Sequence, residues 1–474
     1  MCMLPLTSYA QFTKGLSYRA ETGVSFSGGE HTPFWLTANK QGLSSIEKNN
    51  GYLRAGVFRE LENDKPFSYA FGVDLAVAYN FTSTFIVQQL YADLKYRCLG
   101  LSIGSKERYS EFNNPLLSSG GLTFSGNARP IPQVRIGIPE YTLVPGTKGW
   151  LAFKGHIAYG MFTDDGWQKD FVAPEGKHTE HVLYHSKDLY VKIGNQEKFP
   201  LIFEGGLEMA ALFGGNAFKG NGKIDMPNGI KDFFKVFIPS GGSSDTPMGE
   251  QTNIYGNHLG SWNFSLTWYA PKEWTIRPYY EHYFEDHSQM FGEYGWKDCL
   301  AGMEITFPKN PVVSSFVYEY ISTKDQTGPV YWDHTLEIPE QVSGADNYYN
   351  PSIYTGWQHW GMGIGNPLVM SPIYNTDGEI VFKSNRMQGH HLGIMGNPVN
   401  ELQYRILLSF THSWGTYNLP YYEIKKNGNA LVELTYTPHQ LKGWDFTGSL
   451  GVDRGGMLGK SVGGMFTIRK TGWI

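Results

Sequence analysis

The sequence predicts an all-β protein, a transmembrane antiparallel β-barrel of about 18 strands with long extracellular loops. Three observations support this prediction. Apolar and polar residues alternate along many segments, these segments often exceed ten residues, and the connections between them alternate between short and long. Such alternation is typical of strands that present one face to lipid and the other face to the interior of a barrel.

The alternation is clearest between residues 67 and 79. The odd positions from Phe67 to Tyr79 are all apolar or aromatic, whereas the even positions hold Ser, Ala, Gly and Asp. A tilted strand needs about ten residues to cross a bilayer, and this segment supplies them. The same pattern recurs at residues 151–161, 203–213, 262–268, 404–411, 444–453 and 462–469.

A soluble β-sandwich also alternates, but its strands are mostly about five or six residues long. The connections favour a barrel, because short turns on one side and long loops on the other are typical of outer-membrane proteins. Two connections fit this scheme poorly: residues 454–456 are short where an external loop is expected, and residues 139–149 are long where a periplasmic turn is expected. The expected short turns are residues 62–66, 97–99, 194–200, 270–273, 307–311, 396–400 and 437–443, and the long loops are residues 106–129, 163–182, 214–257, 286–296, 322–380 and 415–427.

The composition agrees with a barrel wall. Charged residues make up 18% of the 474 residues, aromatic residues make up 15%, and there are 57 glycines. The mean hydropathy of −0.34 is low because every second strand residue faces the lumen. The net charge of −5 offers no basic face, so we expect no nucleic-acid partner.

The N-terminus is the only region that we expect to lie outside the barrel. Residues 1–11 are interpreted as a possible remnant of a secretory signal peptide, because Ser8-Tyr9-Ala10 resembles a small-x-small cleavage site; a plain tail is the alternative. Residues 12–474 then form a single barrel domain in the outer membrane of a Gram-negative bacterium, with outer-membrane lipids and the barrel-assembly machinery as partners. Within it, residues 229–236 suit a short helix or an irregular loop.

Residues with the chemistry for metal binding or catalysis are present, but their spacing is not diagnostic. Glu281-His282 stands near Asp286-His287, and the adjacent His390 and His391 would point to opposite faces of a strand. Cys2, Cys98 and Cys299 are scattered, which argues against a disulfide framework and against a zinc site. No nucleophile-elbow motif occurs. We therefore predict no metal site, no cofactor, no catalytic residues and no enzymatic activity.

Six ionisable residues of mixed sign fall at positions that should face the lumen. We interpret them as a cross-lumen network that plugs or rigidifies the barrel, and a polar, ion-conducting channel is the alternative. These residues are Glu204, Glu208, Arg277, Glu281, Glu304 and Arg405.

The longest loop, residues 322–380, is rich in aromatic residues. Exposed rings stack on the apolar faces of sugars, while neighbouring polar groups bind the hydroxyls, so this composition suggests a saccharide site. Two alternatives are an aromatic girdle at the membrane interface and a loop that folds inward to seal the lumen. The residues predicted to bind polysaccharide are Trp332, Tyr348, Tyr349, Trp357, His359 and Trp360.

Several segments together resemble the Wzi-type capsule-assembly family in a Bacteroides-like version. They are residues 33–36 (PFWL), 86–96 (IVQQLYADLKY), 125–133 (SGNARPIPQ), 139–141 with 154–155, 363–375 and 453–459 (DRGGMLG). The resemblance covers most of the chain and implies an 18-stranded outer-membrane barrel that holds capsular polysaccharide at the cell surface as a lectin. The periplasmic helical bundle of the enterobacterial form has no counterpart among amphipathic runs here. A porin for small polar solutes is the alternative function.

Overall fold

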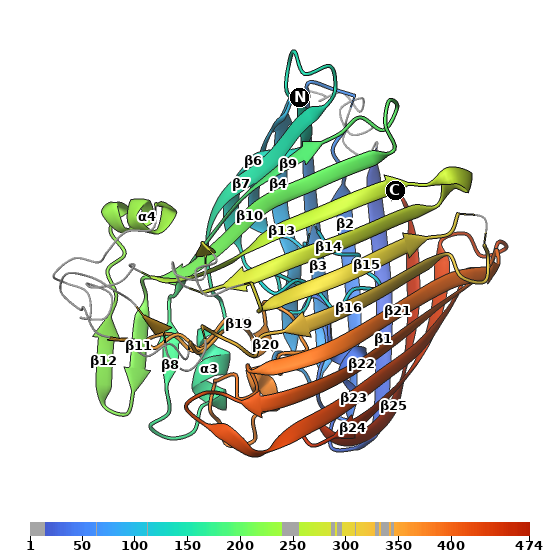
Figure 1. The fold of residues 1–474 in the computed structure, drawn as a ribbon. Coiled ribbons are helices and arrows are strands. Elements are labelled where there is room, and N and C mark those ends of the chain that lie inside the picture. The colour runs from blue at the N-terminus through green and yellow to red at the C-terminus, as the bar shows by residue number, and fades with distance from the viewer. Residues whose placement is uncertain are drawn as a thin grey trace, which may run out of the picture.

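The computed structural model is an antiparallel barrel of 18 strands that closes on itself (Figure 1). It therefore confirms the predicted fold class. The structure describes residues 15–62, 64–110, 112–238, 256–285, 290–291, 296–308, 310–327, 331–332, 341–342 and 346–474, with the side chains of residues 331, 332, 341 and 342 excepted. The expected signal-peptide remnant and the Asp286-His287 pair lie outside these residues.

The strands of the barrel follow one another in chain order. They are β1 (Leu16–Gly29), β2 (Asn49–Arg59), β3 (Phe67–Tyr79), β4 (Phe85–Tyr96), β5 (Leu99–Ser105), β6 (Gln133–Leu143), β7 (Leu151–Met161), β9 (Leu183–Ile193), β10 (Leu201–Phe213), β13 (Asn257–Tyr269), β14 (Thr275–Phe284), β15 (Cys299–Thr306), β16 (Ser315–Ser322), β21 (Met387–Val399), β22 (Leu402–Gly415), β23 (Pro420–Tyr436), β24 (Trp444–Gly455) and β25 (Gly459–Trp473).

The remaining elements lie in the connections. The helices are α2 (Phe34–Thr37), α3 (Asp165–Phe171) and α4 (Ile230–Phe237), with 3-10 turns η1 (Pro271–Glu273) and η2 (Pro372–Tyr374). The short strands are β8 (His178–Glu180), β11 (Asn216–Lys219), β12 (Gly222–Asp225), β17 (Tyr331–Trp332), β18 (Gln341–Val342), β19 (Gln358–His359) and β20 (Met362–Gly363). No helix in the described ranges combines the length and the apolar character needed to cross a bilayer.

The first and last strands close the barrel. β1 pairs with β2 on one side and with β25 on the other, in a register that places Val24 opposite Phe466. Closure matters because an open sheet edge in lipid would leave backbone donors and acceptors without partners. Every neighbouring pair in the ring is antiparallel, so each strand supplies both of its edges to the same hydrogen-bonded wall.

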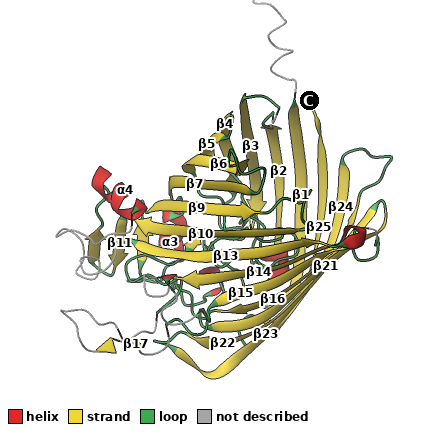
Figure 2. Ribbon diagram, turned by 45° about the horizontal axis from the view of Figure 1, so that its top comes forward, coloured by secondary structure: helices red, strands yellow, loops and turns green. Residues whose placement is uncertain are grey.

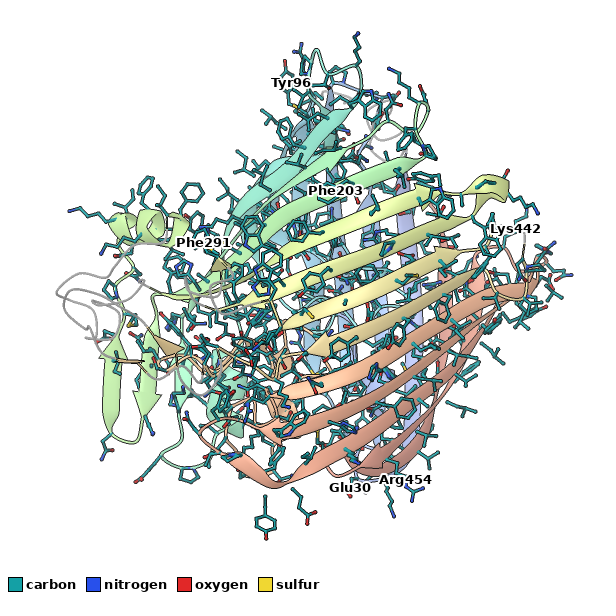
Figure 3. All side chains as sticks on the ribbon, in the orientation of Figure 1. Glu30, Tyr96, Phe203, Phe291, Lys442 and Arg454 are labelled. Atoms are coloured by element: carbon teal, nitrogen blue, oxygen red, sulfur yellow. The ribbon has the colours of Figure 1, made fainter. Side chains whose placement is uncertain are left out.

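The long connections all lie at one end of the barrel, as predicted, but the long loop predicted at residues 415–427 is wrong. β23 begins at Pro420, so only residues 416–419 connect it to β22. β1 begins and β25 ends at the end with short connections, which is the periplasmic end by the convention of outer-membrane barrels (Figure 1). Tyr96 and Lys442 also lie there, whereas Glu30 and Arg454 mark the opposite, extracellular end (Figure 3). The two connections that fitted poorly are resolved: β6 continues to Leu143 and shortens its turn to residues 144–150, and residues 456–458 form a short external hairpin.

The outer wall is apolar and the inner wall is small or polar. On β3, Val73 is 40% exposed and Val77 is 54% exposed, whereas the intervening Asp74 and Ala76 are buried in the lumen. Phe203 on β10 likewise projects from the outer surface (Figure 3). The alternation in the sequence therefore becomes a lipid-facing belt, and the chain is an outer-membrane β-barrel.

The segment suited to a short helix is helical. α4 begins after Gly229, whose backbone N–H donates to Asp232 Oδ2 at 2.9 Å, the reach-back contact of a helix N-terminus. Figure 1 places α4 beside the barrel, outside the ring of strands. The irregular-loop alternative for residues 230–237 is therefore excluded.

Candidate functional site

Three connections fold inward and fill the lumen. We call them the plug: residues 33–46, 112–132 and 346–386, most of which are buried. Figure 2 shows loops inside the ring of strands. The segments bind one another, since Asn127 Nδ2 donates to the Gly363 carbonyl at 2.9 Å and Asn127 Oδ1 accepts from the Asn39 backbone N–H at 3.1 Å. The three segments thus form one body rather than separate loops.

Three of the segments that carry the family resemblance, residues 33–36, 125–133 and 363–375, meet in or directly beside this plug. Ser125 Oγ donates to the carbonyl of Gly365 at 2.7 Å, and the hydroxyl of Thr37, directly after residues 33–36, lies 2.9 Å from that of Tyr374. Residues separated by more than two hundred positions in the sequence are therefore held together by direct hydrogen bonds. These three motifs help to build the plug, whereas residues 86–96, 139–141 and 154–155 belong to the wall strands β4, β6 and β7.

Two wall carboxylates hold the middle segment of the plug. Glu319 on β16 accepts hydrogen bonds from the Ser119 backbone N–H at 2.8 Å and from the Ser119 hydroxyl at 2.6 Å. Glu281 on β14 accepts from the backbone N–H groups of Leu122 at 2.9 Å and Thr123 at 3.1 Å. Both carboxyl groups are buried, so losing either one would leave buried N–H groups of the plug without partners.

The other predicted lumen residues divide between the plug and the open part of the lumen. Arg277 pairs with Glu304 at 2.8 Å and also donates to the plug carbonyl of Phe112. Arg405 pairs with Glu433 at 2.9 Å and donates to the Leu116 carbonyl at 3.1 Å. Glu204 instead accepts from Ser265 Oγ at 3.4 Å, and Glu208 lines the pocket described below, so neither of these two is shown in contact with the plug.

Most of the aromatic residues predicted to bind polysaccharide pack inside the plug. Tyr348, Tyr349, Trp357 and His359 are all at most 1% exposed, so their rings offer no free face to a sugar in this conformation. Their positions follow the inward-folding alternative for this loop, because the plug is where a large apolar surface is buried. The side chain of Trp332 lies outside the described residues.

Trp360 differs from its neighbours because its side chain is half-buried rather than enclosed. The guanidinium of Arg129 lies 4.2 Å from the centre of its ring. The Trp360 backbone N–H donates to Asp164 Oδ2 at 3.1 Å, and the indole Nε1–H donates to Thr163 Oγ1 at 3.3 Å. We call Trp360, Arg129, Thr163 and Asp164 the Trp360 platform, which lies on the loop side of the barrel.

The Trp360 platform is rigidly built. Trp360 has a φ of 57°, a left-handed conformation that costs energy for a bulky residue and is found mainly where the surroundings enforce it. The neighbouring His359 accepts the Thr163 backbone N–H at Nε2 (3.2 Å) and donates from Nδ1 to the Arg129 carbonyl (2.8 Å). Burial lowers the pKa of Arg129 to about 10, opposed by the charge of Asp164, so the cation persists at neutral pH. Sequence reasoning missed Arg129, Thr163 and Asp164 because only the fold brings these residues to Trp360.

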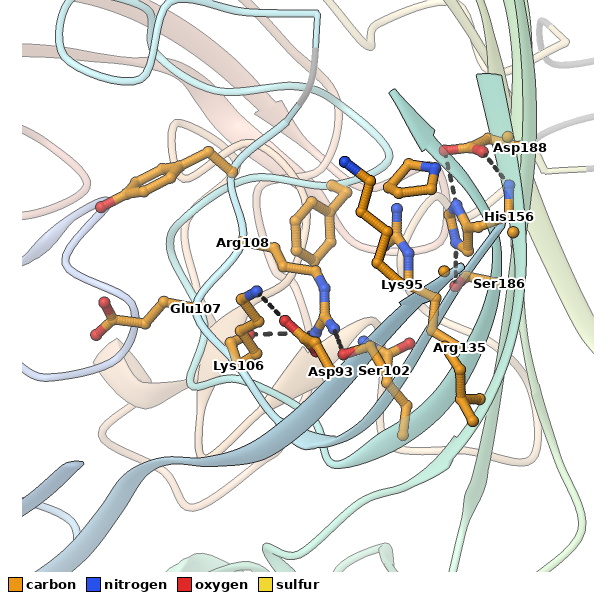
Figure 4. Close-up of a pocket in the computed structure, with 18 of the residues that line it drawn as sticks. Asp93, Lys95, Ser102, Lys106, Glu107, Arg108, Arg135, His156, Ser186 and Asp188 are labelled. Atoms are coloured by element: carbon orange, nitrogen blue, oxygen red, sulfur yellow. Dashed lines mark hydrogen bonds and ion pairs between the residues drawn. The ribbon is translucent and has the colours of Figure 1, made fainter. Parts of the chain in front are cut away.

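A cavity of about 380 Å³ lies between the plug and the periplasmic end (Figure 4). Its lining runs from Leu61 in a periplasmic turn to Arg108 and Phe124 on the plug side. The volume falls within the roughly 300–1,000 Å³ of small-molecule sites. Its charges are mixed: Lys106 Nζ lies 2.6 Å from Asp93 Oδ2, and Arg108 donates to Ser102 Oγ at 2.9 Å. The cavity thus suits a small polar solute but selects no sign of charge.

One wall of this cavity carries a serine, a histidine and an aspartate in contact (Figure 4). His156 Nε2 lies 3.0 Å from Ser186 Oγ, and its Nδ1 lies 2.8 Å from Asp188 Oδ2. Ser186 is paired in register with Ala158 and Ala210 on the two adjacent strands, so the local backbone N–H groups belong to the sheet rather than to an oxyanion site. We assign these residues to the polar inner wall.

Comparison with known proteins gives a likeness of fold alone. No protein-family model matches the chain, and no curated protein is significantly similar to it. Among solved structures, it is similar to Wzi of Escherichia coli, an outer-membrane protein involved in group 1 capsule assembly and described as a carbohydrate-binding β-barrel. The TM-score is 0.60 at 12% identity, over 98% of this chain and 86% of that one. The Bacteroides-like version of the resemblance stays a prediction.

Two Pseudomonas aeruginosa barrels also align over almost the full length. OpdL has a TM-score of 0.48 and OccK5 (OpdH) a TM-score of 0.47, each at 8% identity, over 96% of this chain and 97% of theirs. Likenesses at this level carry no functional argument.

Proposed function

We propose that this barrel binds extracellular or capsular polysaccharide at the cell surface and retains it there, without catalysing a reaction. The observation that carries the proposal is the Trp360 platform, a partly exposed indole packed against a buried arginine on the loop side of the barrel. The fold likeness to a barrel described as carbohydrate-binding is consistent with this function.

The filled lumen favours binding over transport. The plug occupies the region between the extracellular loops and the 380 Å³ cavity, and it is fixed to the wall through Glu281, Glu319 and Arg405. A diffusion porin needs a continuous aqueous path, and the described residues place packed side chains such as Trp357 and Leu122 across it. A ligand arriving from outside therefore meets a surface and not a pore.

The Trp360 platform has the chemistry of a sugar subsite. An indole ring offers a flat apolar face to a pyranose ring, and its fixed backbone removes the entropy cost of ordering it on binding. The Arg129 cation lies against the ring, and the buried Asp164 carboxylate of the same platform opposes its charge. We therefore expect stacking on the ring to dominate, so that acidic and neutral polysaccharides both bind.

Substituting Trp360 with alanine is expected to weaken polysaccharide binding by more than tenfold. A central aromatic residue of a binding surface contributes about 2 kcal/mol or more, which is roughly thirtyfold in affinity. The measurement is binding of the detergent-purified barrel to an acidic polysaccharide such as alginate and to neutral dextran immobilised on a sensor surface.

Tyr417→Ala is the matched control, because Tyr417 also lies against an arginine, with Arg386 Cζ 3.6 Å from its ring centre, but it belongs to a different loop. We expect this variant to bind as the wild type does. Unchanged binding by Trp360→Ala would refute the Trp360 platform as the saccharide site, and failure of the wild type to bind any polysaccharide would refute the proposed function itself.

A further inference from the structure

The outer wall of the barrel carries buried polar residues beneath α4. Ser186 lines the luminal cavity, so its neighbours on β9, His185 and Lys187, point to the outer face. His185 is nevertheless only 1% exposed. A histidine and a lysine on the lipid side of a barrel are costly, and here α4 covers them.

Specific contacts dock α4 onto this wall. The hydroxyl of Tyr159 donates to the Phe233 carbonyl at 2.8 Å, and the two rings lie 5.1 Å apart. The Lys187 ammonium donates to the carbonyls of Val236, at 3.4 Å, and Phe237, at the C-terminal end of the helix. A cation at that end also interacts favourably with the helix dipole. The helix therefore satisfies the charge that the wall would otherwise present to lipid.

The opposite side of the helix is apolar and largely exposed among the described residues. Ile230 is 78% exposed, Phe234 is 68% exposed and Ile238 is 66% exposed, at a spacing of four residues that places them on one face. Lys231 flanks this face and is also exposed. Exposed rings and branched chains beside a basic residue are typical of helices that lie in a membrane interface.

The strand register gives the height of α4 on the barrel. Tyr159 on β7, which contacts the helix, is paired with Val134 on β6. Lys187 on β9 is paired with Ile157 on β7, and Ile157 is paired in turn with Ile136 on β6. Val134 is 51% exposed and Ile136 is 57% exposed on the outer wall. The wall under α4 is therefore level with exposed apolar residues of the lipid-facing belt, close to the extracellular end of β6.

We infer that α4 is a lipid-docking helix. Its Ile230 and Phe234, together with Ile238 directly after its last residue, contact acyl chains of the outer leaflet and replace the wall surface that the helix covers. Lipid is the expected partner of this helix face, because the apolar face of α4 continues the apolar belt of the barrel wall that already faces lipid. The inference rests on the barrel fold and not on the proposed polysaccharide binding.

The test places a bimane label at Phe234→Cys in a variant whose Cys2, Cys98 and Cys299 are replaced by serine. The full-length barrel is reconstituted in phosphatidylcholine vesicles, and quenching is compared between lipid carrying a doxyl group at carbon 5 and aqueous iodide. Ile136→Cys serves as the lipid-facing reference and Lys223→Cys on β12 as the water-facing reference, since both side chains are exposed. Ile230→Cys repeats the measurement at a second position of the same helix face.

We expect the ratio of lipid quenching to iodide quenching at Phe234 and Ile230 to match that at Ile136 and to exceed that at Lys223 severalfold. A ratio equal to that at Lys223 would overturn the inference by showing that the helix face is in water. Weak quenching by both agents would overturn it as well, because the face would then be covered by protein.

Discussion

Replacing Val73 with arginine is expected to prevent stable insertion of the barrel. Val73 lies at the centre of β3, on the outer face and between two apolar neighbours of the same face, Phe71 and Leu75. An arginine at the bilayer midplane on the lipid face of a barrel costs ~2–4 kcal/mol, a large part of the stability of a typical domain. Heat-modifiable mobility on gels and urea unfolding in vesicles measure the loss.

The matched control is the same substitution on the same face at the membrane edge. Tyr79 ends β3 at the extracellular side and is 68% exposed. The cost of arginine falls to ~0–1 kcal/mol near the interface, so Tyr79→Arg should fold almost as the wild type does. Equal losses of stability in Val73→Arg and Tyr79→Arg would contradict the account, because Val73 would then lie no deeper in the lipid than Tyr79.

Removing both plug anchors is expected to open the lumen. In the Glu281→Ala/Glu319→Ala variant, the backbone N–H groups of Ser119, Leu122 and Thr123 lose their carboxylate partners. A buried donor left without a partner costs ~1–3 kcal/mol, so the plug loses several kcal/mol of attachment to the wall. Vesicles containing this variant should take up small sugars, and the amides of residues 117–123 should exchange hydrogen at least a hundredfold faster.

Glu204→Ala controls for the loss of a luminal carboxylate as such. Glu204 faces the lumen on β10 and accepts a hydrogen bond from Ser265, but it is not shown to hold the plug. This variant should stay closed and exchange as the wild type does. If the double variant also stayed closed, the packed side chains and not Glu281 and Glu319 would be what holds the plug.

The wall could be predicted from the sequence because it repeats one physical rule. Each residue of β3 obeys the alternation, so its lipid face, its lumen face and its length all follow from residues 67–79 alone. The turns and the strand number follow from the same rule applied along the chain. Only connections whose strands continued beyond the regular pattern, such as that after β6, were misjudged.

The site depends on contacts that no local pattern encodes. Trp357 and Trp360 stand three positions apart in the same aromatic loop, yet the first is fully buried and the second is accessible. What separates them is the packing of residues 112–132 and 162–164 against the loop, including the Trp357 indole N–H, which donates to the Thr123 carbonyl at 2.8 Å. The composition of residues 322–380 could indicate a sugar-binding loop or a loop that closes the lumen. It could not show which aromatic ring is exposed for binding and which is buried in the plug.

The outward-facing Lys187 shows the same limit on the wall itself. Its position breaks the rule of apolar residues on the lipid face, and the reason is a helix that begins more than forty residues later in the chain. The sequence suggests a short helix at residues 229–236, but it does not show that this helix returns to cover β9. Local exceptions to a regular pattern thus mark places where distant segments dock.

The most direct test of a sealed, surface-binding barrel is electrical recording from the purified wild-type protein in a planar lipid bilayer. The plug that fills the lumen predicts a silent bilayer, with no resolved current steps at moderate voltage, under conditions where gel mobility confirms that the barrel is folded and inserted. Regular, long-lived open steps from the wild type would contradict the sealed lumen and would favour a diffusion channel for small polar solutes.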